Sequence, residues 1–261
     1  MQRNARAAWW VASLCALLIG CGGPDEPLEE TFEHTYPIDP NAAITLTSFD
    51  GSIEIYGSEK PEIHLQATKK AYTAARLHGI SVNVSAQPNS ISIETTSPPA
   101  KNWSFSDRSG TVDYIVVVPQ TARIARLELK NGEILVSGMQ AGDVHVNLGN
   151  GRLFVRNCFC DVQAAEATGA LVLIYDWWNP RKFSADAQIA DGNLFAIIPG
   201  DASFHLMAEA ANGKIGNDFA EKEERTGGTV TKIDSRVGAS PQTTINLRAI
   251  DGNIKIVEAN P

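Results

Sequence analysis

Three acidic residues, Asp50, Asp191 and Asp251, each stand immediately before a glycine, and a series of carboxylates could supply general acids and bases. Polysaccharide-cleaving β-helix enzymes use carboxylates on neighbouring coils, and this chemistry needs a pair at fixed separation. At other repeats, however, asparagine fills the same slot, as at Asn131 and Asn150. Because Asn and Asp both suit the turn conformation before a glycine, we interpret the slot as a backbone feature and predict no catalytic residue.

A second group of residues could bind rather than catalyse. The segment Y-D-W-W-N-P-R-K at residues 175–182 carries two adjacent tryptophans. Since adjacent residues of a strand point to opposite faces, both tryptophans cannot enter the core from a regular strand. An exposed aromatic beside arginine suits contact with a protein or a sugar. Tyr175, Trp177, Trp178 and Arg181 are therefore the candidate binding surface; the alternative is that one tryptophan covers the core beneath a long loop.

The cysteines and histidines give weak signals for metal binding. Cys158 and Cys160 form a lone C-x-C, whereas zinc needs four ligands, and a disulfide across one residue would be strained. Alignment of N-C-F-C-D-V with G-M-Q-A-G-D-V places Cys158 at the core slot of Met139 and Cys160 near the turn at Gly142. We predict no metal or cofactor site. The histidines are scattered singly and are expected at the surface: His34, His64, His78, His145 and His205.

The N-terminus predicts export. Arg3 and Arg6 precede an apolar run at residues 7–19, which is too short to span a membrane as a stable helix. The ending L-I-G-C resembles a bacterial lipobox, which implies a signal peptide over residues 1–20 and acylation of Cys21; the alternative is an ordinary signal peptide. No aspartate follows Cys21, so the resemblance favours the outer membrane in a host that has one.

The next segment and the overall charge bear on partners. Residues 21–40 are rich in proline and acid, which predicts a flexible tether behind the acylated cysteine. The chain has a formal net charge of -8. Nucleic-acid binding requires clustered Lys and Arg, so the acidic balance argues against it.

A repeated unit must position all of these residues. An Asn-Gly or Asp-Gly pair followed by alternating apolar residues recurs, with glycines at 132, 151, 169, 192, 213 and 252. A period near 20 in β-type sequence predicts a solenoid, whereas antiparallel hairpins repeat every 8–12 residues. The pairs are expected to be tight turns between strands, for instance two strands within residues 44–56. The last gap, 39 residues, is consistent with one coil that lacks its marker.

The chain divides into two parts beyond the tether. Residues 41–120 predict a β-rich segment with one helix at residues 69–78, ended by Gly79, and a hairpin around Gln87-Pro88-Asn89. Residues 121–258 predict the solenoid repeats, interrupted at 175–182 and by a charged insertion at 217–228. Insertions of this kind map to loops and often form the binding surface.

The ordered motifs N-G-E-I-L-V, N-G-R-L-F-V, G-D-V and D-G-N-I-K-I resemble the bacterial putative-adhesin domain of unknown function, over roughly residues 40–258. The resemblance implies an all-β, right-handed parallel β-helix or solenoid-like array without a known catalytic centre. Thr168-Gly169, which lacks Asn, departs from the pattern.

The sequence thus favours a cell-envelope lipoprotein that acts as a non-catalytic, adhesin-like binding or scaffold module. Its expected partners are the membrane, through the lipid anchor, and an envelope protein or glycan. Two alternatives remain open: a carbohydrate-active β-helix enzyme, and a sensory or regulatory ectodomain that works through a protein partner.

Overall fold

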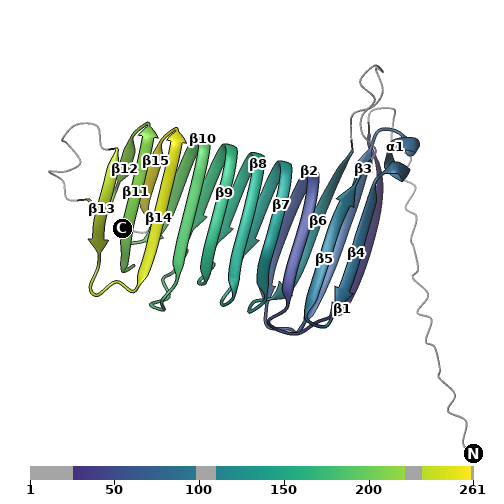
Figure 1. Ribbon diagram of the computed structural model, residues 1–261, viewed down its shortest axis with the longest axis horizontal. Coiled ribbons are helices and arrows are strands. Elements are labelled where there is room, and N and C mark those ends of the chain that lie inside the picture. The colour runs from purple at the N-terminus through teal and green to yellow at the C-terminus, as the bar shows by residue number, and fades with distance from the viewer. Residues whose placement is uncertain (1–25, 98–109, 221–230, 260–261) are drawn as a thin grey trace, which may run out of the picture.

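The computed structural model describes residues 26–97, 110–220 and 231–259, which form an all-β domain with one short helix, α1 (Ala74–Gly79) (Figure 1). The predicted signal peptide, Cys21 and most of the charged insertion lie outside the described residues. The strands are β1 (Leu28–Pro37), β2 (Ala43–Ser58), β3 (Glu62–Ala71), β4 (Ser81–Gln87), β5 (Ser90–Thr96), β6 (Thr111–Pro119), β7 (Arg123–Ser137), β8 (Asp143–Arg156), β9 (Asp161–Ile174), β10 (Ser184–Pro199), β11 (Phe204–Asn212), β12 (Ile215–Asn217), β13 (Lys232–Val237), β14 (Thr243–Asp251) and β15 (Ile254–Ala259).

The central strands β7 to β10 are long, and each bends at a glycine without ending. In β8 the bend is at Gly151, whose φ is 140°. The prediction of tight turns between separate strands is therefore wrong for β2 and the central strands, where the Asn-Gly and Asp-Gly pairs lie inside continuous strands. At Asn212-Gly213 and Asp251-Gly252, by contrast, the pair does separate two strands, β11 from β12 and β14 from β15. Glycine at positive φ turns the strand while the ladder to its neighbours continues. Each such strand has a first half before the glycine and a second half after it.

Successive coils are parallel and in register, as the solenoid prediction requires. Gly151 pairs with Gly132 of β7 and with Gly169 of β9, so the bends form a column. A Cβ placed on Gly151 would lie 1.8 Å from the backbone oxygen of Gly132. The column thus requires glycine both for its φ and for the close approach of the backbones.

Both halves contribute to one hydrophobic core through their alternating inward positions. In β8 these are Val144, Val146 and Leu148 before the bend, and Leu153 and Val155 after it, all buried. Solenoid coils stack these positions into continuous inward rows, so each coil covers the apolar edge of its neighbour. The solenoid-like arrangement agrees with the prediction, and the handedness of the winding stays a prediction.

The two ends depart from the simple repeat. At the N-terminal end, the first half of β2 pairs with β5 and the second half with β6; β4 and β3 then add antiparallel strands. At the other end, β14 lies between β10 and β11, and β13 is antiparallel at the edge. The 39-residue gap therefore holds the edge strand β13 rather than an unmarked coil. The predicted hairpin is confirmed as β4–β5, with Gln87 opposite Ser90.

Two further predictions near the N-terminus are wrong, for one reason. Residues 28–37, predicted to be tether, form β1, which pairs with β3. Lys69 and Lys70, predicted to be helical, lie in β3, where they form ion pairs with Glu30 (2.9 Å) and Glu29 (3.5 Å) of β1. Cross-strand partners outweigh local helix propensity here. The helix consequently starts at Ala74, behind the N-cap Thr73.

Candidate functional site

The structure distributes the predicted aromatic surface over three environments. Tyr175 is only 1% exposed, and its hydroxyl donates to the carbonyl oxygen of Cys158 (3.4 Å). Trp178 is partly buried and packs against Phe204, with ring centroids 5.8 Å apart. Trp177 is 48% exposed and packs at a tilt against buried Phe159, with ring centroids 4.3 Å apart. The prediction that one tryptophan faces solvent is confirmed for Trp177, whereas Tyr175 belongs to the core.

Arg181 stabilises the loop after β9 through hydrogen bonds from its side chain and to its backbone. Its Nη1 donates to the carbonyl oxygen of Gln140 (2.7 Å), and its own carbonyl oxygen accepts from the hydroxyl of Thr243 (2.9 Å). These bonds tie the loop after β9 to the loop after β7 and to β14. Of the four predicted residues, Trp177 and Arg181 are therefore exposed, and Arg181 already uses part of its guanidinium within the loop.

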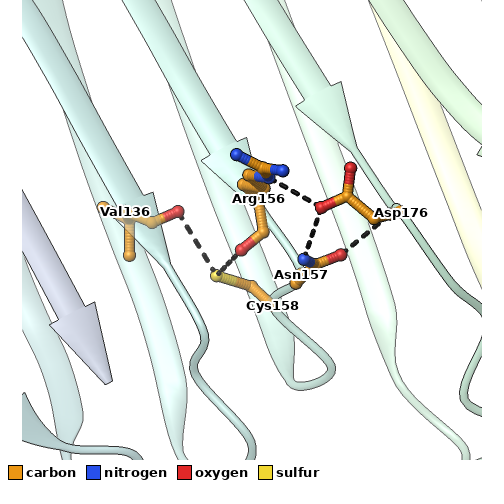
Figure 2. A network of polar contacts seen from close by, with 5 residues as sticks. All are labelled: Val136, Arg156, Asn157, Cys158 and Asp176. Atoms are coloured by element: carbon orange, nitrogen blue, oxygen red, sulfur yellow. Dashed lines mark hydrogen bonds and ion pairs between the residues drawn. The ribbon is translucent and has the colours of Figure 1, made fainter. Parts of the chain in front are cut away.

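A polar network fixes the start of this loop (Figure 2). Arg156 Nε donates to Asp176 Oδ2 at 2.6 Å, and Asn157 Nδ2 donates to the same oxygen at 2.7 Å. The backbone N–H of Asp176 donates to Asn157 Oδ1 (2.9 Å). The hydrogen bond from Arg156 lowers the pKa of Asp176. The residue before Trp177 is thus anchored from both its backbone and its side chain.

Both described cysteines are free and buried. Cys158 lies in the core, as predicted, with its Sγ close to the carbonyl oxygens of Val136 and Arg156 (Figure 2). Burial raises the pKa of Cys158 to about 12 and also raises that of Cys160, so both are neutral thiols at physiological pH. In the part of the chain that the structure describes, no three His, Cys, Asp or Glu side chains gather as metal ligands.

The acids before the glycines form part of a side-chain ladder along the bends. Asn131 Nδ2 donates to Asp50 Oδ1 (2.7 Å), and Asn150 Nδ2 donates to Asn131 Oδ1 (2.9 Å). At the other end, Asn212 donates to Asp251 (2.7 Å). This geometry fits the interpretation of the slot as structural, because Asp and Asn exchange hydrogen bonds between coils.

The outward positions of the first halves form a hollowed polar surface, which we call the polar face. In one register row His145, Gln163, Asp186 and Asn246 follow each other across β8, β9, β10 and β14. The neighbouring row carries Asn147, Ala165, Gln188, Arg248 and Glu209. Amide, carboxylate and guanidinium groups thus alternate across the coils.

Small side chains hollow the middle of the polar face. Gly149, Ala167 and Ala190 form a third row beside Ala165. Hollows of about 330, 360 and 650 Å³ border these small residues, and one of about 410 Å³ lies beside them towards β11 and β13. Neighbouring hollows share Asn147, Gln188 or Arg248 along their walls. They therefore form one groove across the coils. The alternation of the sequence predicts only that these positions face solvent. The signal for a groove is that small and amide residues recur at equivalent positions of the repeat.

Comparison of the sequence with models of known protein families shows the family of this chain. The model of the family described as Toastrack DUF4097 matches residues 39–257. The chain belongs to this family. No protein of curated function matches the Toastrack chain.

One solved structure shares the fold of this Toastrack domain, and two others show a weaker similarity. A putative cell adhesion protein from Clostridium sporogenes ATCC 15579 has a TM-score of 0.50 and 14% identity, covering 88% of this chain and 100% of its own. A putative adhesin from Bacteroides fragilis NCTC 9343 has a TM-score of 0.31 and 12% identity, covering 87% and 97%. A putative lipid binding protein from Parabacteroides distasonis ATCC 8503 has a TM-score of 0.29 and 9% identity, with the same coverage. Within the described residues, no helix has the length and hydropathy of a membrane span.

One acid of the Toastrack domain is buried, which the sequence analysis did not predict. Glu166 is 3% exposed and stands in an inward row between Leu148 and Ile189. Its Oε1 accepts from the backbone N–H of Ala170 (3.0 Å) across the bend, whereas Oε2 has no partner. Burial raises its pKa to about 7. The only sequence signal was an acid at an inward position of the alternation.

Proposed function

We propose that this Toastrack protein is a lipid-anchored binding module of the cell envelope, and that its polar face holds an extended glycan. The observation that carries the proposal is the groove across β8, β9, β10 and β14, whose single hollows are as large as small-molecule sites. Family membership and the shared fold are consistent with a binding module.

The chemistry of the groove favours a polymer rich in hydroxyl groups. The amides of Asn147, Gln163 and Gln188 each donate and accept, as sugar hydroxyls do, while Arg248 adds donors. Each hydrogen bond contributes only about 0.5–1.5 kcal/mol after desolvation. Useful affinity therefore requires contacts over several sugars, which a groove across several coils can supply.

A hydrolytic function is the second candidate, because carboxylates on adjacent strands line one hollow. Glu209 and Asp234 are diagonal neighbours on β11 and β13, with their Cα atoms about 7–8 Å apart. Inverting glycosidases hold their carboxyl groups about 6.5–9.5 Å apart. Their general acid also needs burial, however, whereas the Asp234 side chain is 70% exposed and pairs with His205 (2.7 Å). Binding without turnover is therefore preferred.

The anchor belongs to the same proposal. Acylation of Cys21 would hold the domain at the membrane, with the outer membrane favoured, and about 0.8 kcal/mol for each buried methylene makes two or more chains a firm anchor. Mass spectrometry of the mature N-terminus tests this: an acylated Cys21 is expected, and an unmodified first residue other than Cys21 would refute the anchor. Sensing through an envelope protein remains the hypothesis to examine if no glycan binds.

Glycan binding is tested with a substitution that fills the groove without changing the core. Ala165→Phe places a large ring on the floor of the groove, and Ala170→Phe places the same ring on the other outer surface of β9. In affinity electrophoresis with polysaccharide purified from the host envelope, we expect the first change to abolish retardation and the second to preserve it. Equal retardation of both variants would refute the site. Release of reducing ends that is lost in Asp234→Asn would instead support hydrolysis.

A further inference from the structure

In the second halves of β7 to β10, the outward-facing residues are apolar as well as the inward-facing ones. The segments I-L-V, L-F-V, L-V-L-I and L-F-A-I-I follow the bends of β7, β8, β9 and β10. Near-continuous apolar runs are typical of strands that are covered on both faces. The outward members define what we call the apolar face: Ile115, Val117, Leu135, Phe154, Val172, Ile174, Phe195, Ile197 and Val257.

Within the described residues, no element covers the apolar face. The helix α1 makes its main contacts with β1 and β3, at the N-terminal end. Strands lie about 4.8 Å apart and alternate residues about 6.8 Å apart, so the face from β6 to β15 is about 30 Å wide and, with side chains, about 20 Å high. This footprint is comparable to the roughly 800 Å² that each partner buries in a standard interface.

The central row of the apolar face carries one acid and one base, and beyond them it continues to Ile115 of β6 on the acidic side and to Gly216 of β12 on the basic side. In register across β2, β7, β8, β9, β10 and β15, the row reads Glu54, Leu135, Phe154, Val172, Phe195 and Lys255. Four apolar side chains thus separate an acid from a base. Glu54 accepts from the hydroxyl of Tyr56 through Oε2 (2.6 Å), and among the described residues Lys255 forms no ion pair.

We propose that the apolar face binds the apolar face of a second copy of this chain, around a two-fold axis parallel to the strands. Rotation about this axis reverses the row, so Glu54 of each copy faces Lys255 of the other. Leu135 then faces Phe195, and Phe154 faces Val172, so large and small side chains meet at each apolar pair. A two-fold interface requires this kind of self-complementarity, in which each pair occurs twice.

The regular spacing also fits a second copy as the occupant. The row repeats at the strand spacing, and only a surface with the same spacing can meet it at every coil. Two sheets that pack face to face with aligned strands place their inner residues about 10 Å apart and interdigitate them. The paired copies would leave both polar faces outward, so the dimer is compatible with the proposed glycan binding but does not depend on it.

The orientation of the two copies is tested by cross-linking the full chain in its native envelope. In one copy Glu54 and Lys255 lie about 24 Å apart, so a short thiol cross-linker cannot join them within the chain. The variant carrying both Glu54→Cys and Lys255→Cys is expected to give cross-linked dimers, whereas either single change gives none. Dimers from Glu54→Cys alone would overturn the two-fold arrangement, and no dimers from the double change would overturn the interface. Cys158 and Cys160 are buried and do not compete.

The apolar contact is tested with two changes on β9. Val172→Lys places a charge on the apolar face, and Gln163→Lys places the same charge on the polar face. By analytical ultracentrifugation of the detergent-purified full chain, we expect the first variant to sediment as a monomer and the second as a dimer, like the unaltered protein. A monomeric unaltered protein, or a dimeric Val172→Lys variant with native circular dichroism, would overturn the proposal.

Charge reversal tests the two charged positions of the row. Glu54→Lys or Lys255→Glu alone is expected to weaken dimerisation about tenfold, because like charges then meet twice across the axis. Combining both changes restores opposite charges and is expected to return the dimer Kd to within about threefold of the original. A double variant weaker than either single variant would contradict the pairing. Failure of glycan binding in the Glu54, Lys255 or Val172 variants is read separately, because the groove lies on the other outer surface.

Discussion

The polar face and the apolar face are built from two halves of the same strands, yet their outward rows have opposite chemistry. Inward, the two halves are alike, with Leu148 before a bend and Leu153 after it both buried in one core. Outward, Asn147 and Gln163 face the groove, whereas Phe154 and Val172 form an apolar row. The comparison teaches that the repeat constrains the inward rows and the bends, while the outward rows are free to specialise.

The largest expected effect comes from breaking the bend that both faces share. Gly151→Val would place Cβ 1.8 Å from the oxygen of Gly132 and force a branched residue to φ 140°. We expect the free energy of unfolding to fall by about 4 kcal/mol or more. Urea denaturation measures this. Gly216→Ala is the control, since a Cβ there meets only Lys255 Cγ at 3.9 Å; equal losses in both variants would refute the role of the bend.

The next effect concerns the loop edge that closes the core opposite the bends. Trp178→Ala removes a ring packed on Phe183 and Phe204, and we expect a loss of about 3 kcal/mol in the free energy of unfolding. Trp177→Ala removes a half-exposed ring and should cost less than about 1 kcal/mol. Thermal or urea unfolding of the matched pair decides the point, and the reverse order would show that Trp177 is the structural residue.

A pH-dependent effect is expected at the buried acid among the inward rows. The carboxyl of Glu166 has a pKa of about 7 in the fold against an ordinary 4.5, so the folded state holds its proton more tightly. Stability should therefore fall by about 2 kcal/mol as pH rises from 4.5 to 8, and the loss should be complete above the folded pKa. Urea denaturation across this range should show the loss in the unaltered protein and not in Glu166→Leu.

The control for this titration is Glu209→Gln, which changes an acid of the polar face and should keep the pH dependence. A pH profile that is unchanged in Glu166→Leu would assign the titration to another group.

The smallest effect is expected at the surface network beside the exposed tryptophan. Asp176→Ala removes the bonds from Arg156 and Asn157, which are exposed to water, so we expect less than about 1 kcal/mol in global stability. Backbone amide exchange at residues 176–178 should nevertheless accelerate, because the anchored N–H of Asp176 loses its fixed geometry. Glu128→Ala, at another surface ion pair, should leave that exchange unchanged.

The repeat made much of the fold predictable, because the period and the alternation directly encode coil length and inward rows. Ile134 and Val136 are buried as their spacing indicates. The form of the bend was missed because Asn-Gly has the same local chemistry in a hairpin and in a bent strand. Strand β1 was missed because its acids resemble a tether until Lys69 and Lys70 of β3 are placed opposite them.

The candidate site was less predictable than the fold. The adjacent tryptophans were noticed, but which of them faces solvent depends on the loop after β9, where the strand alternation ends. The groove depends on residues that are distant in sequence and adjacent across coils, such as Asn147, Gln188 and Arg248. Register between strands, which no local pattern contains, brings these together.

The position of β14 between β10 and β11 has a consequence for how the chain is completed (Figure 1). During synthesis β11, β12 and β13 emerge before the strands that join them to β10, so this part of the sheet cannot assemble until β14 and β15 have been made. Removal of β14 and β15 would therefore take out strands from between β10 and β11 or β12, rather than strands at the edge of the sheet. New coils can be gained by duplication only among β7 to β10, where each neighbour in space is also a neighbour in sequence.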